Sequence, residues 1–480
     1  MTKRFAGTLV LALMFTGVVR AGVNELPELP PLPPLDEIGS TSGTISDSAV
    51  PQPILPVTGT EWTLPDTFSP RGARLIAIEK EAPAPLPMES SPPAEPVRVR
   101  RVCPDYNSDA WTIPQPCFLQ NLGIRMGGWL EQGMTFNAQD PADRFNGPVA
   151  TNDLDSEYQM NQLWLWFDRP ADNGGCGFAW GGHVDIMYGT DWRFGINQGL
   201  EDRINGFDYQ TYGMVIPQFY LELAYNRLSV KLGHFAGILD YEAVPAPMNP
   251  FYSHSYSYGY TVPQLVTGVL ADYKLTDQFS IQAGFHRGWM KFEDNNDELD
   301  FMGGVKWKSW NDRLTLAYAV SAGPQGDDGD RDRFVYSFVA QYQVNKRFKY
   351  VFVHNLGTEN NALRNGGDAE WYGINQYFLY TINPCWMAGM RVEWMRDDDG
   401  VRIGGPGNIP GVRAWSGRGF AGDFYEITWG LNWRPNGNWT VRPELRYDWY
   451  DGLAGPTGLP FDGGSKDHQL TVGIDAIFSF

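Results

Sequence analysis

The sequence of 480 residues predicts an all-β fold: a transmembrane, antiparallel, up-and-down β-barrel of about sixteen strands, preceded by a disordered Pro-rich arm. Three observations predict this fold. From residue 123 onward, segments of about ten residues alternate apolar and polar side chains. The connections between these segments alternate regularly between long and short. The last segment alternates to its end and closes on an aromatic residue, Phe480.

The composition supports this fold class and excludes others. Charged residues make up 19% of the chain, below the roughly 25% of an average soluble domain, and aromatic residues make up 14%. After the N-terminus no apolar run reaches the roughly 18–20 residues that a spanning helix needs. A net charge of −19 argues against a nucleic-acid partner, because nucleic-acid binding requires a basic surface.

The first residues are typical of a secretory signal peptide, predicted at 1–21. Lys3 and Arg4 precede an apolar stretch from Phe5 to Val19, and Ala21 lies at a small-residue cleavage site. A membrane anchor is the alternative, although the apolar stretch is short for one. The signal predicts secretion through the inner membrane into an oxidising compartment.

Residues 22–120 form the predicted Pro-rich arm. Proline is dense, Ser, Thr and Glu fill the gaps, and neither a helical nor a strand period persists. Such a segment buries too little apolar surface to offset its ordering entropy, so we expect a disordered periplasmic spacer. Contact of the arm with cell wall or a periplasmic partner is the alternative. Prolines cluster at Pro27, Pro30, Pro31, Pro33 and Pro34 and again at Pro83, Pro85, Pro87, Pro92, Pro93 and Pro96.

Residues 121–480 form the predicted outer-membrane barrel, and the segment 439–449 shows its pattern most clearly. Side chains alternate between the two faces of a strand, so one face is apolar and the other is charged. Aromatic residues lie at both ends of the apolar face, as expected of a lipid-facing strand between two interfacial girdles. Pro443 cannot donate a ladder hydrogen bond, and we expect a local bulge there. The apolar face carries Trp439, Val441, Pro443, Leu445, Tyr447 and Trp449, and the other carries Thr440, Arg442, Glu444, Arg446 and Asp448.

Short and long connections alternate to the end of the chain. Short turns on the periplasmic side and long loops outside are typical of outer-membrane barrels, whereas a Greek-key sandwich does not separate loop lengths so regularly. The strands are predicted near 123–135, 156–168, 177–188, 213–225, 228–236, 264–274, 278–290, 299–309, 312–322, 333–345, 348–356, 369–382, 386–396, 423–433, 439–449 and 467–480.

The sequence predicts the register of one hairpin. If Asn226 and Arg227 form a two-residue turn, Tyr225 lies opposite Leu228, and Glu222 lies opposite Lys231 as an oppositely charged pair on the inner face. A slip by one residue would move charges into lipid.

The chain resembles the outer-membrane β-barrel porins of the OmpL-like group over residues 123–480. The resemblance rests on the opening 127–133 (GGWLEQG), on the segments 230–235 (VKLGHF), 241–242 (YE) and 249–256 (NPFYSHSY), and on the barrel-type C-terminus. It implies passive diffusion of small hydrophilic solutes and ions, with outer-membrane lipid around the barrel. Analogy with general porins implies a homotrimer. The motifs are architectural, so they do not identify the solute.

No motif predicts an enzyme, a cofactor or a metal site. Gly-x-Ser-x-Gly, His-Glu-x-x-His and phosphate-loop patterns are absent from the sequence. His183 and Asp185 share one strand face, and a pair wetted by the lumen is favoured over a metal or acid–base site. An outer-membrane hydrolase is therefore the least favoured alternative, behind a structural anchor whose arm binds cell wall or a periplasmic partner.

The charged inner face predicts a water-filled lumen, and the connection 237–263 is the expected constriction. Its prolines and tyrosines argue against disorder, and its place as the third long loop matches the inward-folded loop of general porins. Folded inward, Asp240 and Glu242 would face arginines of the wall across a narrowed pore; packing on a neighbouring subunit is the alternative. Inner acids slightly outnumber inner bases, which predicts a weak cation preference. The pore-lining candidates are Asp240, Glu242, Glu222, Lys231, Arg391, Glu393, Arg442, Glu444 and Arg446.

Four cysteines map to the periplasmic rim. Cys176 and Cys385 lie in turns far apart around the ring, beyond the roughly 7 Å between Cα atoms that a disulfide allows. We therefore favour a disulfide between Cys103 and Cys117, closing a short loop, with a bond from the arm to Cys176 as the rival.

Overall fold

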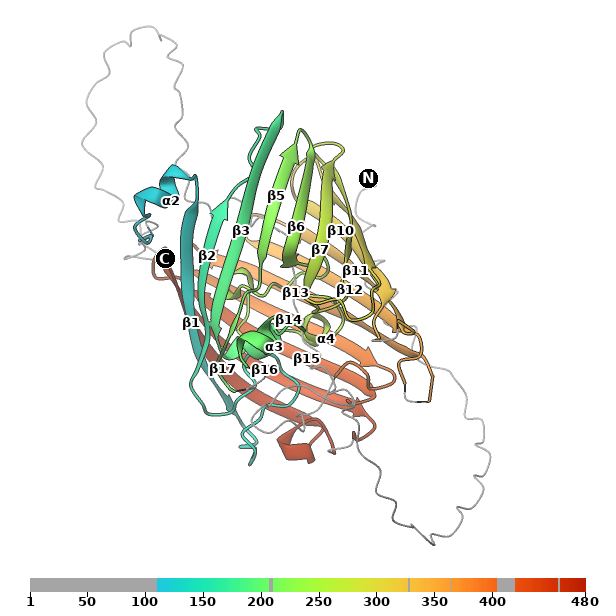
Figure 1. The fold of residues 1–480 in the computed structure, drawn as a ribbon. Helices are drawn as coiled ribbons and strands as arrows, with labels where there is room; N and C mark the ends of the chain where they lie inside the picture. Colours follow the sequence, from blue (N-terminus) through green and yellow to red (C-terminus); the bar gives the residue numbers. More distant parts are fainter. Residues whose placement is uncertain (1–109, 207–209, 327–328, 364, 404–418, 456–457) are drawn as a thin grey trace, which may run out of the picture. The chain divides into compact units, whose positions relative to one another are not determined.

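The computed structural model describes residues 110–206, 210–326, 329–363, 365–403, 419–455 and 458–480. In this part of the chain sixteen antiparallel strands form one closed barrel (Figure 1). The predicted antiparallel barrel of about sixteen strands is confirmed. The strands are β1 (Arg125–Asn137), β2 (Gln159–Arg169), β3 (Phe178–Gly189), β5 (Phe219–Tyr225), β6 (Leu228–Ala236), β7 (Leu265–Lys274), β8 (Phe279–His286), β9 (Asp300–Lys308), β10 (Leu314–Pro324), β11 (Asp332–Gln343), β12 (Phe348–Glu359), β13 (Ala369–Asn383), β14 (Trp386–Asp397), β15 (Gly422–Trp433), β16 (Trp439–Gly452) and β17 (His468–Ser479).

Each strand pairs with its neighbours in sequence, and the barrel closes where β1 meets β17. This seam runs from Trp129 opposite Ser479 to Asn137 opposite Thr471. Membrane-facing side chains such as Val269 and Leu431 are about 40% exposed, at 43% and 39%, because the apolar face of each strand points away from the lumen. No helix in the described ranges is long and apolar enough to cross a membrane.

The predicted strand 213–225 is divided in two. The three-residue strand β4 (Gly213–Val215) is separated from β5 by a bulge at Pro217. Met187 pairs with Val215 and Val184 with Phe219, so one strand has an extra residue between these pairs. Proline has no N–H for the ladder, and a bulge accommodates that loss.

Two other predictions about register have opposite outcomes. The hairpin at Asn226 and Arg227 is confirmed, with Tyr225 opposite Leu228 and Glu222 opposite Lys231. The bulge expected at Pro443 is wrong, because the register is the same on both sides of it: Gly430 pairs with Glu444, and Trp433 with Val441. The ladder between β15 and β16 is interrupted there without an inserted residue.

The long connections lie together at one end of the barrel and the short turns at the other, as predicted. Several long loops contain short helices. These are η2 (Thr190–Phe194) and α3 (Glu201–Ile204) in the second long loop, η3 (Ala246–Met248) and α4 (Tyr256–Tyr260) in the third, and η4 (Asp462–Gly464) in the last. The long loops span 138–158, 190–218, 237–264, 287–299, 325–331, 360–368, 398–421 and 453–467.

The final residues of the predicted arm are ordered on the barrel. The Trp111 ring stacks on Phe478 at 6.2 Å between centroids, and its backbone N–H donates to Asn438. A short helix, α2 (Cys117–Asn121), follows. Disorder to residue 120 is therefore wrong for residues 110–120. The signal peptide and the rest of the arm lie outside the described residues.

The predicted disulfide is wrong at Cys117. Cys117 begins α2 with an exposed free thiol, and Cys176 is likewise free and exposed, so neither the favoured nor the rival pairing forms. Cys385 is buried and disulfide-bonded. The other two described cysteines are free, and Cys103 lies outside the described residues. The separation around the ring argued against a bond between Cys176 and Cys385, but it gave no reason to prefer Cys385 over Cys117 as a bonded cysteine.

Side chains from the long loops fill the long-loop half of the lumen. One buried apolar cluster joins inward residues of the strands, such as Val335, Trp371 and Phe424, to loop residues, such as Leu239 and Tyr260. The barrel therefore has an internal core at this end, in addition to its apolar outer surface.

Candidate functional site

The third long loop, residues 237–264, is called the lumen loop here. It leaves β6, packs along the inner face of β11 to β16, and returns to β7. The aromatic side chains between Phe251 and Tyr260 are inaccessible to solvent, as expected because such side chains are costly to leave in water. Relative exposure is 1–2% for Phe251, Tyr252, Tyr256, Tyr258 and Tyr260.

Glu242 of the lumen loop forms an ion pair with Arg391 of β14. Its Oε1 lies 2.9 Å from Arg391 Nη1 and accepts from the Tyr377 hydroxyl, and its Oε2 lies 2.7 Å from His254 Nδ1. Burial alone would raise the pKa of Glu242, but Arg391 and His254 hold the pKa at about 2. Arg391 also donates to the carbonyl of Ser253 and pairs with Glu426. This cluster joins the loop to the wall.

Two carboxylates of the wall accept hydrogen bonds from backbone amides of the same loop. Glu393 of β14 accepts from the N–H groups of Tyr256 and Ser257, at 2.7 and 2.6 Å. Glu444 of β16 accepts from those of Tyr252 and Ser253. Turns and the first residues of helices leave backbone N–H groups without a backbone acceptor, and these carboxylates accept their hydrogen bonds.

Two arginines of β16 bind the backbone carbonyls of the loop. Arg442 donates to the carbonyls of Ala246 and Asn249, at 2.9 and 2.8 Å, and pairs with Asp475 and Glu131. Arg446 donates to the carbonyl of His254 and pairs with Asp448. The wall thus binds both backbone N–H and backbone carbonyl groups of the lumen loop. This loop is irregular and has few hydrogen bonds within its own backbone.

Asp240 does not face the arginines. Its carboxylate accepts from Asn355 Nδ2 of β12, and its backbone N–H donates to Ser337 of β11. Burial raises the pKa of Asp240 to about 6. Of the two loop acids that were expected to face wall arginines, Glu242 does so, and it contacts Arg391 directly. These charges touch, and they do not face each other across an open gap.

The inner charges of β14 to β16 are covered, contrary to the expectation of a wetted wall. We call this set the clamped wall, and each member is at most 5% exposed. A cavity beside the loop, lined in part by Gln162, Asp191 and His254, has a volume of about 20 Å³, enough for about one water molecule. The clamped wall consists of Arg391, Glu393, Glu426, Arg442, Glu444, Arg446 and Asp448.

A second group of inner charges remains reachable from the short-turn end. Lys231, opposite Glu222, is half-buried and lies 4.6 Å above the Tyr220 ring. Lys349 lies beside Tyr241 of the lumen loop. We call the lysines on the lumen face of β6, β7, β9 and β12 the lysine wall. It consists of Lys231, Lys274, Lys306, Lys308 and Lys349, each half-buried or exposed.

Sequence reasoning missed several residues that position the loop. Ser337, Asn355 and Tyr377 lie at inward positions of β11, β12 and β13, and the alternation of strand faces was a usable signal for that placement. Arg193 and Asp153 form a buried pair between two other long loops, with two contacts of 2.8 Å, which no pattern predicted. His183 lies between Asp168 and Asp185, at 3.3 and 3.0 Å.

The chain matches one family of known proteins. A family profile described as "Putative beta-barrel porin-2, OmpL-like" matches residues 123–480. No curated protein matches the chain. Similar solved structures include the outer membrane channel DcaP of Acinetobacter baumannii, with 12% identity, TM-score 0.49, and coverage of 74% of this chain and 97% of that chain. The anion-selective porin from Comamonas acidovorans has 11% identity, TM-score 0.49, and coverage of 74% and 99%. OprB of Pseudomonas putida has 14% identity, TM-score 0.47, and coverage of 76% and 96%.

Proposed function

Because the chain belongs to this β-barrel porin family, we propose that it is an outer-membrane porin for passive diffusion of small hydrophilic solutes and ions. Secretion through the inner membrane precedes insertion, and the lumen loop sets the constriction. The observation that carries the proposal is the attachment of that loop to the inner wall from β11 to β16. A homotrimer, by analogy with general porins, is part of the proposal.

The attachment supports a fixed constriction. Glu242 with Arg391, and Glu444 with two loop amides, hold the loop at several points. Charge-assisted hydrogen bonds are roughly twice as strong as neutral ones. A loop held in this way narrows the passage without a gating motion.

The reachable charges bear on the solute class. Acids such as Glu393 and Glu444, which supported the predicted cation preference, are buried in the clamped wall. The reachable part of the lumen carries the lysine wall, with Glu222 and Asp272 as carboxylates among it. Charge rings set ion preference, so we propose that small anions are favoured over cations. The cation preference stays as the competing prediction.

Single-channel conductance in a planar bilayer tests the proposal. Deleting residues 243–258, in a variant whose barrel still folds, should raise conductance and the size limit for solutes. The matched control deletes residues 361–363 of another long loop, and its conductance should match that of the wild type. A folded deletion variant with unchanged conductance would show that the loop does not constrict the pore.

A structural anchor is the second candidate. The buried state of the clamped wall and the docking of Trp111 on Phe478 favour it, because a sealed barrel with a tethered arm would hold cell wall or a periplasmic partner. Wild-type protein that inserts into bilayers without conducting would support the anchor and reject the porin.

A further inference from the structure

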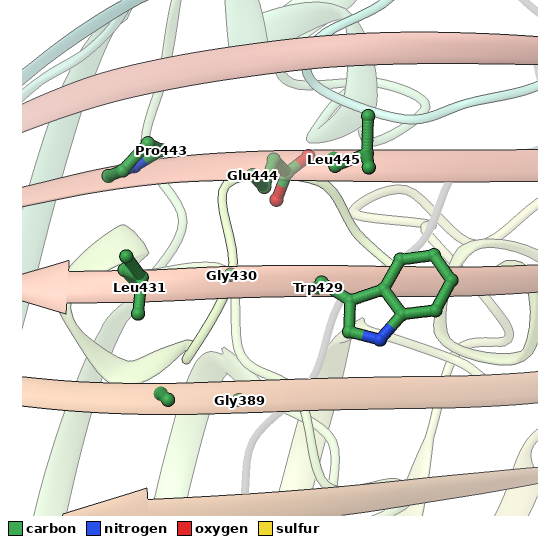
Figure 2. A pocket seen from close by; sticks show the side chains of 8 residues that line it. Gly389, Trp429, Gly430, Leu431, Pro443, Glu444 and Leu445 are labelled. Atoms are coloured by element: carbon green, nitrogen blue, oxygen red, sulfur yellow. The ribbon is translucent and has the colours of Figure 1, made fainter. Parts of the chain in front are cut away.

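A groove on the membrane face of the barrel runs across β14, β15 and β16. Its cavity volume is about 390 Å³, within the range of small-molecule pockets. Figure 2 shows Leu431 and Pro443 at one end, Trp429 and Leu445 at the other, and Gly430 and Glu444 between them. Trp429, Leu431 and Leu445 are 39–45% exposed on the membrane face. Glu444 points to the lumen, where it binds the lumen loop.

The groove lies where the ladder between β15 and β16 is interrupted. Pairing stops at Gly430 with Glu444 and resumes at Trp433 with Val441. On its other side β16 pairs with β17 without a break, including Pro443 with Ile474. The missing N–H of Pro443 therefore faces β15, and the two strands are not joined there.

The inner side of the groove is closed by one ring of the lumen loop. Gly389 and Gly430 lie opposite each other on β14 and β15. A Cβ atom on either glycine would lie 2.8–2.9 Å from the Phe251 ring, which is 2% exposed. Phe251 thus forms a floor directly against two glycine backbones, and a side chain at either position would displace it.

We propose that this groove is a binding site for one acyl chain of a membrane lipid. Ala388 and Pro443 leave room on the membrane face, and larger apolar side chains form the sides. Trp386 and Trp433 stack at 5.9 Å between ring centroids, two residues along the strands from Ala388 and Leu431. Trp marks the membrane–water interface, so the groove begins roughly 7 Å inside the hydrocarbon, at about 3.3 Å per residue.

The chemistry of the lining favours an acyl chain over a hydrophilic solute. The side chains on the membrane face are apolar, and the Glu444 carboxylate is already occupied by the amides of Tyr252 and Ser253. A flexible chain from the bilayer needs no polar partner. The inference uses the barrel's membrane-facing surface and does not depend on conduction, so it is tested separately from the porin proposal.

The experiment uses the full chain in liposomes containing a phosphatidylcholine with a photoreactive diazirine on its acyl chain. Adducts should concentrate on residues 429–431 and 443–445. Ala388→Leu fills the groove and should lower these adducts several-fold. Ala271→Leu, the same substitution on the membrane face of β7, should leave them unchanged. Pro443→Val restores an N–H toward β15 and should lower them as well.

Three outcomes would overturn the proposal. Adducts spread evenly around the barrel would show no specific site. Equal adduct yields in the wild type, Ala388→Leu and Pro443→Val would show that the groove holds no chain. A photoreactive benzoylphenylalanine at Leu431 that crosslinks to a second copy of the chain, and not to lipid, would make the groove an interface between copies.

Discussion

The clamped wall and the lysine wall lie on the inner face of the same barrel, and their charges have different environments. Arg391, Arg442 and Arg446 are at most 2% exposed and bind a loop. Lys231 and Lys306 are only half-buried and lie toward the open short-turn end. Both groups come from strands with the same alternation of apolar and charged residues.

The difference shows that an inward charge has two roles in a wide barrel. Where a loop covers the wall, charges must be paired, because an uncompensated buried charge is strongly destabilising. Where no loop covers it, charges stay hydrated and act on passing solutes. Stability should therefore depend on the clamped wall, and ion preference on the lysine wall.

The largest expected effect comes from removing a charge of the clamped wall. Arg442→Met should lower the free energy of unfolding by about 3–5 kcal/mol, because Asp475 and Glu131 lose their partner while buried. Urea unfolding in detergent micelles measures this.

The matched control is Lys306→Met on the lysine wall. It should change the free energy of unfolding by no more than about 0.5 kcal/mol, as most substitutions away from buried networks do. Equal losses in the two variants would remove the distinction between the walls.

A smaller loss of stability is expected from removing the Tyr377 hydroxyl, which donates a hydrogen bond to Glu242. Tyr377→Phe removes a 2.6 Å hydrogen bond to that carboxylate and should cost about 1.5–3 kcal/mol, the range for bonds to charged groups. Tyr380→Phe, on the membrane face of the same strand, is the control and should cost less. The two urea midpoints give the comparison, and equal midpoints would contradict it.

A further prediction concerns the contribution of Asp240 to the pH dependence of stability. Its folded pKa of about 6 lies above the usual value of about 3.9, so between these pH values the folded protein binds a proton that the unfolded chain does not. Lowering the pH from 7 to 5 should therefore stabilise the fold through this group. Glu242 behaves in the opposite way, because its folded pKa of about 2 lies below its unfolded value. Its contribution to stability is complete above the unfolded pKa and is lost as the pH falls toward 2.

Asp240→Asn stays uncharged and should gain less stability than the wild type between pH 7 and pH 5, because the contribution of Asp240 is lost. Unfolding midpoints at both pH values measure it, with Asp277→Asn in an exposed turn as the control. If Asp240→Asn gains as much as the wild type, the effect belongs to other groups.

The smallest effect on stability is expected from the lysine wall, where the change should be in selectivity. Replacing Lys231, Lys306 and Lys349 by Gln should shift the reversal potential in a KCl gradient toward cations. The shift should fade as salt shortens the Debye length, about 10 Å at 0.1 M. Cation preference in the wild type at low salt would favour the sequence-based prediction.

Much of the barrel was predictable because strand periodicity is local. A side chain's face follows from its position along the strand, so the segment 439–449 revealed its lipid face without a partner. The register of the hairpin at Asn226 followed from a two-residue turn and one charge pair. The inner-face placement of Arg391, Glu393 and Glu444 followed from the same alternation.

Other features depended on contacts distant in sequence. Pro217 and Pro443 present the same local signal, a proline within a predicted strand. Only Pro217 lies at a bulge, because the backbone of Gln218 there binds Asp185 of β3. The cysteine prediction used loop length and ring separation, and neither indicates that Cys385 is bonded outside the described barrel residues.

By itself, the sequence determined the fold class, the antiparallel order of the strands, and which residues face lipid or lumen. These properties follow from side-chain period and turn length, which each segment carries locally. The tertiary structure decided which lumen charges are buried, that Glu242 pairs with Arg391 while Asp240 binds Asn355, and that Phe251 closes the gap beside Gly430. Those pairings join residues separated by about 100 to 180 positions along the chain, and only barrel closure with the lumen loop inside brings them together.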